Sequence, residues 1–135
     1  MRDAVLWDSS AILALIDASD RNHALAVKAA RGPLRKLRPF ITNYVEVEAH
    51  ALLLTRVGRV VARQWLTQGG LHVVRADGDE EQAARQLLIL HADKDWSLCD
   101  AISFAVVEAR GARGAFSFDR HFRERGRFEV FGLTR

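Results

Sequence analysis

The fold is decided by the stretch Ala4-Val5-Leu6-Trp7-Asp8-Ser9-Ser10, which continues as Ala11-Ile12-Leu13-Ala14-Leu15-Ile16. A short apolar run of strand length reaches a carboxylate and two hydroxyl residues, and the next apolar residues continue as a helix. In an open parallel α/β sheet, ligands bind at the carboxyl ends of the strands. Asp8 is therefore a candidate site residue, but Asp and Ser are also common helix caps, so this stretch alone leaves both interpretations open.

The same alternation of short strands and longer helices continues along the chain. Further strands are expected at 40–42, 71–74, 115–118 and 128–131, and further helices at 23–31, 44–56, 59–66, 80–91 and 97–110. This pattern predicts a three-layer α/β/α sandwich with a central, mainly parallel sheet that is covered on both faces. Without repeats or linkers, residues 1–135 are expected to form a single domain.

Composition excludes several classes of protein. The single cysteine, Cys99, excludes an internal disulfide framework and suits a reducing cytoplasm. No apolar run is long enough to span a membrane and the N-terminal residues lack the pattern of a signal peptide, so a cytoplasmic protein without membrane contact is expected. The net charge is only +3, yet all but three of the twenty Lys and Arg residues are arginine. Arginine suits phosphate binding, although a GC-rich genome would produce the same bias.

Four acids stand where a solvated surface explains them poorly: Asp8, Glu48, Asp100 and Asp119. Asp119 repeats the pattern of Asp8, because it follows an apolar strand and precedes a helix. Asp100 stands three residues after Ser97, a capping-box spacing that is compatible with a site at the start of that helix.

The remaining acid, Glu48, lies one turn into the helix 44–56, which is apolar nearly all round and is therefore expected to be buried. Glu46 is its competitor in this helix. Asn43 and Glu46 have the spacing of a capping box, which gives Glu46 a structural explanation that Glu48 lacks. Glu48 is thus the favoured working acid.

Acids at strand ends and on early helix turns converge on one edge of a parallel sheet. Their mutual repulsion requires a cation, and an all-oxygen set of ligands suits Mg²⁺ or Mn²⁺. Such a site polarises a phosphoryl oxygen and activates water for in-line attack. The residues therefore predict metal-dependent phosphodiester hydrolysis, with arginines holding a nucleic acid.

The segments 6–15, 42–48, 96–104 and 116–122 together resemble the PIN-domain ribonucleases, and in particular the VapC-like toxins of bacterial toxin–antitoxin pairs. The resemblance implies that Asp8, Glu48, Asp100 and Asp119 form the catalytic metal site, supported by the hydroxyls of Ser9 and Ser117. It also implies an RNA substrate, Mg²⁺ or Mn²⁺ as the cofactor, a homodimer, and an antitoxin whose tail enters the acidic groove. Cys99 replaces a threonine that is common in the family.

Other residues are candidates for supporting roles. The five histidines lack metal-ligand spacing, and His121 alone stands close to a candidate acid. Asp95 could reach the groove. Two basic clusters could position phosphates or simply face solvent, and the candidates within them are Arg35, Arg38, Arg120 and Arg123. Two alternative functions stay open: a housekeeping RNA-processing PIN nuclease without an antitoxin, and a catalytically idle module that binds RNA or protein.

Overall fold

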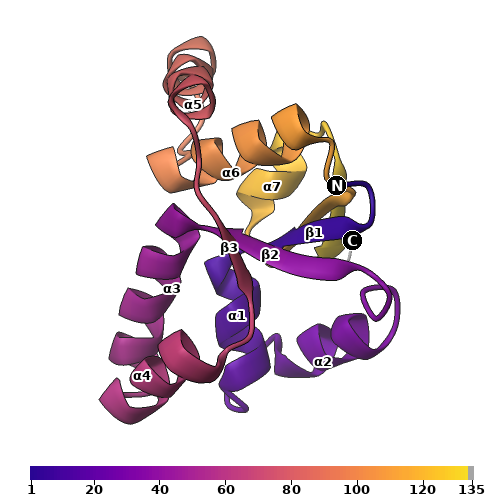
Figure 1. The fold of residues 1–135 in the computed structure, drawn as a ribbon, viewed down its shortest axis with the longest axis vertical. Helices are drawn as coiled ribbons and strands as arrows, with labels where there is room; N and C mark the ends of the chain where they lie inside the picture. The colour runs from indigo at the N-terminus through magenta and orange to yellow at the C-terminus, as the bar shows by residue number, and fades with distance from the viewer. Residues whose placement is uncertain (134–135) are drawn as a thin grey trace.

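A computed structural model describes residues 1–133 and contains one sheet with helices on both faces (Figure 1). The strands are β1 (Ala4–Trp7), β2 (Arg38–Thr42), β3 (His72–Val74), β4 (Gly114–Ser117) and β5 (Glu129–Gly132). The helices are α1 (Ser9–Ile16), α2 (His23–Arg31), α3 (Asn43–Arg56), α4 (Arg59–Gln68), α5 (Gly78–Leu90), α6 (Leu98–Arg110) and α7 (Arg120–Arg125).

The sheet has the strand order β3-β2-β1-β4-β5, and every pairing in it is parallel. β1 occupies the centre, where Leu6 is level with Phe40 of β2 and Trp7 is level with Phe116 of β4. The carboxyl ends of β1 and β4 therefore lie side by side. This confirms the predicted parallel α/β architecture and brings the residues after both strands to one edge.

Alternating side chains of the strands fill two different cores. Leu6 packs with α6 on one face of the sheet, and Val5 packs with α1 and α2 on the other. In Figure 1, α5, α6 and α7 lie above the sheet and α1 to α4 lie below it. The three predicted layers are thus present. No helix within residues 1–133 is long and apolar enough to cross a bilayer.

Two expectations about α3 are wrong. The helix buries a single stripe, formed by Val45, Ala49 and Leu53, while Val47 is 70% exposed on another side. The helix carries more apolar side chains than the neighbouring elements can cover. The N-terminal cap is the buried Thr42, whose hydroxyl accepts the amide N–H of Val45, and the Asn43 side chain instead accepts the amide N–H of Ala76.

Candidate active site

The four predicted acids line one cleft of about 370 Å³ at the carboxyl edge of the sheet. Each comes from a different part of the chain. Asp8 follows β1, Asp119 follows β4, Asp100 lies in the first turn of α6, and Glu48 lies in the second turn of α3. The remaining lining residues are Ser9, Ser10, Leu52, Asp95, Ser97 and His121. Residues distant in sequence thus form a single acidic cleft, which Asp95 also reaches.

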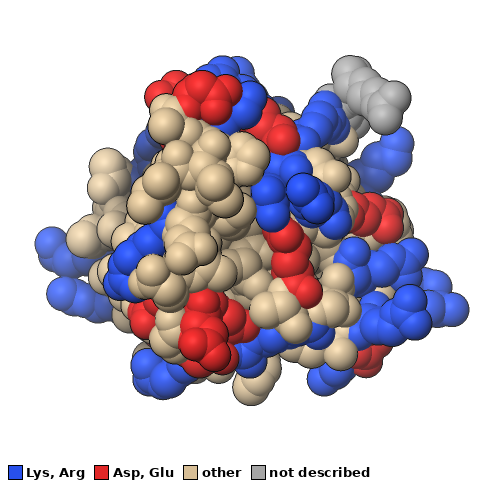
Figure 2. Space-filling view, turned by 90° about the horizontal axis from the view of Figure 1, so that it is seen from above, with Lys and Arg blue, Asp and Glu red and all other residues tan. Residues whose placement is uncertain are grey.

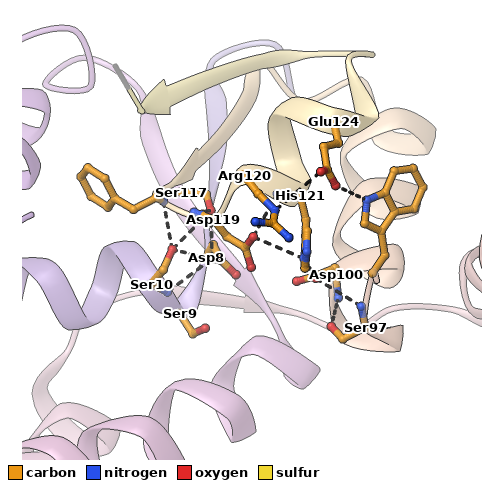
Figure 3. Close-up of polar contacts among 12 residues, drawn as sticks. Asp8, Ser9, Ser10, Ser97, Asp100, Ser117, Asp119, Arg120, His121 and Glu124 are labelled. Atoms are coloured by element: carbon orange, nitrogen blue, oxygen red, sulfur yellow. Dashed lines mark hydrogen bonds and ion pairs between the residues drawn. The ribbon is translucent and has the colours of Figure 1, made fainter. Parts of the chain in front are cut away.

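Asp8 is the most buried of the four acids, with 3% of its surface exposed. Its Oδ2 atom accepts hydrogen bonds from the hydroxyls of Ser10 at 2.7 Å and Ser117 at 3.0 Å (Figure 3). Oδ2 also accepts the amide N–H of Ser10 at 3.3 Å, so Asp8 caps α1 as well. The carboxylate of Asp8 therefore caps α1 and lines the cleft at the same time.

Glu48 takes part in the cleft and Glu46 does not. The hydroxyl of Ser9 donates a hydrogen bond to Oε1 of Glu48. Glu46 faces another part of the surface, close to Trp65 on α4. Because α3 turns by about 100° per residue, acids two positions apart point in different directions.

Asp100 and Asp119 are joined by His121. The ring Nδ1 of His121 lies 3.0 Å from Oδ2 of Asp100 and 3.3 Å from Oδ1 of Asp119 (Figure 3). The backbone adds to both contacts. Asp119 accepts the amide N–H of His121 at 2.9 Å, and Asp100 forms the predicted capping box with Ser97. One carboxylate oxygen of Asp100, one of Asp119 and a ring nitrogen of His121 all lie within 4.8 Å of one another, a spacing that permits metal binding.

Three of the carboxylates are held by one oxygen only. Within residues 1–133, hydrogen bonds reach Asp8 through Oδ2, Asp100 through Oδ2 and Asp119 through Oδ1. The second oxygen of each of these three accepts no hydrogen bond from the described residues and remains available as a ligand. Oriented carboxylates with free oxygens are the donors that Mg²⁺ and Mn²⁺ prefer, so the site fits a divalent cation.

The electrostatics of the cleft agree with this fit. Burial raises the pKa of Asp8 to about 7, and the nearby carboxylate of Glu48 contributes to the rise. Burial also raises the pKa of Asp100. For His121, burial lowers the pKa, but the hydrogen bond to Asp100 and the surrounding carboxylates outweigh it and raise the pKa. Negative charge is therefore costly in this cleft until a cation neutralises it.

The thiol of Cys99 adds no nucleophile to the cleft. It is partly buried, and that burial, together with the carboxylates of Glu48 and Asp8, raises its pKa above the usual range. A thiol in this environment stays protonated.

The four predicted RNA-binding arginines lie at two ends of the sheet. Arg120 and Arg123 are exposed on α7, directly after Asp119. Arg35 and Arg38 lie before and at the amino end of β2, opposite the cleft. Arg38 also donates two hydrogen bonds to Asp3, at 2.8 and 2.9 Å.

Ser10 is the residue that the sequence analysis missed. Ser9 and Ser10 both follow Asp8, and only the direction of the first turn of α1 determines which hydroxyl reaches which carboxylate. The Ser10 hydroxyl also accepts the amide N–H of Phe118 at 3.0 Å, which ties the end of β4 to α1. His121 was noticed only for its nearness to Asp119; its contact with Asp100 depends on tertiary structure.

The sequence profile of the PIN domain matches residues 5–127. The chain belongs to the PIN-domain family. Over 131 residues, this PIN domain is 31% identical to the 23S rRNA-specific endonuclease VapC20 of Mycobacterium tuberculosis, with 93% of the chain and 97% of VapC20 covered. These matches confirm the expected resemblance, and the protein is a VapC-like ribonuclease toxin.

Solved structures agree. The crystal structure of M. tuberculosis VapC20, described as a sarcin–ricin loop cleaving toxin, matches with a TM-score of 0.81 and 29% identity, covering 95% of this chain and 99% of that one. A toxin–antitoxin complex from Klebsiella pneumoniae matches with a TM-score of 0.61 at 13% identity, covering 88% of this PIN domain and 89% of that chain. The second likeness shows the fold alone.

Proposed function

We propose that this protein is a Mg²⁺- or Mn²⁺-dependent endoribonuclease that cleaves 23S rRNA in the sarcin–ricin loop. The observation that carries the proposal is the acidic cleft, in which four carboxylates meet and three of them, Asp8, Asp100 and Asp119, each keep one oxygen free of hydrogen bonds within residues 1–133. The choice of RNA follows from the likeness to VapC20 over nearly the whole length of both proteins.

The chain's own residues hold and orient the site. Asp8, Glu48, Asp100 and Asp119 would hold the divalent ion, which would lower the pKa of a bound water and offset charge on the phosphate. Ser9, Ser10, Ser117 and His121 are positioning residues that fix the carboxylates through hydrogen bonds. On α7, the exposed Arg120 and Arg123 are the proposed contacts to the RNA backbone.

The decisive experiment incubates purified ribosomal RNA with the protein in Mg²⁺ or Mn²⁺ and maps the new 5′ ends. We expect one cut in the sarcin–ricin loop, complete loss of cutting in EDTA, and at least a hundredfold (~10²) lower rate in Asp8→Asn, because a ligand charge is lost. Asp79→Asn, an exposed acid on α5 outside the cleft, is the matched control and keeps the full rate.

The same experiment separates the alternatives. Binding of RNA without cleavage by the wild-type protein in either metal would refute the nuclease and leave an idle binding module. Cuts confined to precursor RNAs, with mature ribosomes untouched, would indicate a housekeeping processing enzyme.

The proposed partner is a small antitoxin protein, in keeping with the VapC-like class of this PIN domain. An acidic cleft favours a basic inhibitory tail, because a cation there offsets carboxylate repulsion. Co-expression with the adjacent small reading frame is expected to yield a complex that lacks RNA cleavage until the partner is removed. The proposed compartment is the cytoplasm, where ribosomes are found.

We also propose a homodimer that covers apolar side chains of three adjacent helices. Val47 on α3, Ile89 and Leu90 at the end of α5, and Leu98 at the start of α6 are exposed. Figure 2 shows a broad area without charged side chains on the face seen from above, where α5 and α6 lie in Figure 1. Light scattering should give twice the chain mass, and Ile89→Glu with Leu90→Glu should give a monomer.

A further inference from the structure

A second cleft adjoins the acidic one. It has a volume of about 560 Å³ and lies between the loop that follows α1, the end of α3 and the end of β4. Ser10 and Leu52 line both clefts, so the two spaces are neighbours. The second cleft is therefore within reach of a nucleotide next to a phosphate held at the acids.

The walls of the second cleft combine an aromatic ring with two arginines. Phe118 is half-buried, and its ring packs edge-on against Phe116, with the centroids 5.8 Å apart. Arg21 and Arg56 line the same cleft, are exposed, and form no ion pair within residues 1–133. By contrast, Arg110 and Arg125 bond to carboxylates at 2.8 and 2.7 Å.

The acids of this cleft are already engaged locally. Asp17 accepts the hydroxyl and amide of Ser19 at 2.6 and 3.0 Å, and Asp20 accepts the amide of Asn22 at 2.8 Å. The charge of Arg56 lowers the pKa of Asp17, but neither Arg21 nor Arg56 donates a hydrogen bond within residues 1–133, so their guanidinium N–H groups are available to a ligand. An aromatic surface beside free guanidinium groups is the usual means of holding an unpaired nucleotide.

We infer that the second cleft binds the single-stranded nucleotide next to the scissile phosphate, with its base against Phe118 and its backbone at Arg21 and Arg56. This inference rests on the proposed RNA cleavage. The structure supplies a direct connection between the two clefts, because Ser10 bonds both the Asp8 carboxylate and the backbone of Phe118. A base packed on Phe118 is therefore held at a fixed position relative to the acids.

The test uses RNA hairpins that carry the mapped cleavage position, with an abasic residue placed in turn at each flanking nucleotide. We expect one abasic substitution to lower kcat/KM for the wild-type protein by about tenfold, the scale of one lost base–aromatic contact. Phe118→Leu keeps apolar packing but removes the ring. For this variant, kcat/KM on the intact hairpin should fall by a similar factor, and the abasic substitution should lower it no further. Phe118→Tyr retains the ring and should retain the abasic penalty.

The arginines are tested separately. Arg21→Gln with Arg56→Gln should raise KM with kcat nearly unchanged and flatten the salt dependence of binding, because phosphate contacts are lost. Arg63→Gln, an exposed arginine on α4, is the control and should behave as wild type. If RNA is cleaved but Phe118→Leu and the abasic substitution lower kcat/KM additively at every position, the inference is overturned. Absence of cleavage by the wild-type protein would instead overturn the proposed function.

Discussion

Single hydroxyl groups orient the acids of the cleft. Ser10 and Ser117 donate to the same oxygen of Asp8, and Ser9 donates to Glu48. Because Asp8 is buried, its carboxylate finds no compensating water when a hydroxyl is removed. The hydroxyls are thus part of the metal site even though they leave its ligand oxygens free.

Ser10→Ala is expected to weaken Mn²⁺ binding by about tenfold, as for other residues that support a metal ligand, and to lower the free energy of unfolding by about 1 kcal/mol. Calorimetric titration and urea unfolding measure the two effects. Ser103→Ala is the matched control, because the buried Ser103 hydroxyl has no hydrogen-bond partner among residues 1–133. Unchanged Mn²⁺ affinity in Ser10→Ala would contradict the positioning role.

Sequence reasoning reached the acids of this cleft but not all of their partners. Asp8 and Asp119 could be found because strand ends in a parallel sheet share an edge. Glu48 lines the cleft and Glu46 does not, although the capping box offered for Glu46 does not form, because Thr42 caps the helix. The role of Ser10 depends on helix direction, which residue types do not encode.

At the scale of elements, α5 and α6 are joined by an ion pair far from the cleft. Nε and Nη2 of Arg110 donate to the two carboxylate oxygens of Glu80, both at 2.8 Å, and Glu80 is 4% exposed. Glu80 also completes the capping box of α5 with Asp77. The hydrogen bonds from Arg110 lower the pKa of Glu80, so the carboxylate stays charged inside the helix pair.

Arg110→Leu should lower the free energy of unfolding by about 2 kcal/mol, less than for a fully buried pair because the Arg110 side chain is 31% exposed. Urea unfolding provides the measurement. Adding Glu80→Gln should recover part of the loss, since the neutral amide can still accept from Asp77 without leaving a buried charge. If the double variant is as unstable as Arg110→Leu, an unpaired Glu80 charge is not the cause. RNA cleavage at low temperature should be unaffected in both.

The elements themselves follow from local pattern, whereas their neighbours do not. Apolar runs ended by Gly32-Pro33 or Gly69-Gly70 place most boundaries to within a few residues. The order β3-β2-β1-β4-β5 needs long-range pairing that no single run encodes. The exposure of Val47 shows the same limit, because burial depends on what packs against a helix as well as on its composition.

At the scale of the whole molecule, the acidic cleft should make stability depend on pH. Burial raises the pKa of Asp8 to about 7 and also raises that of Asp100, while both return to about 4 in the unfolded chain. The folded protein thus holds protons that the unfolded chain has lost, and its stability falls as pH rises through this window. The raised pKa of His121 acts in the same direction, since a protonated imidazole stabilises the fold until pH exceeds its folded pKa.

We therefore expect the metal-free protein to unfold at a lower urea concentration at about pH 8 than at about pH 5.5. The free energy of unfolding should differ between the two pH values by a few kcal/mol at most. Asp8→Asn should reduce this difference. Mn²⁺ should restore stability mainly at the higher pH, because it binds the folded, deprotonated site. Urea titrations in EDTA and in Mn²⁺ measure the effect, and equal midpoints at both pH values in EDTA would rule it out.

The central position of β1 has a consequence for how the toxin is made. β1 is synthesised first, yet its partner β4 begins only at residue 114, and Asp119 follows it. A nascent chain that stops short of Asp119 lacks one of the four acids, however well its earlier helices have formed. The acidic cleft of the proposed nuclease is therefore completed only late in translation, and the nascent chain lacks it through most of elongation.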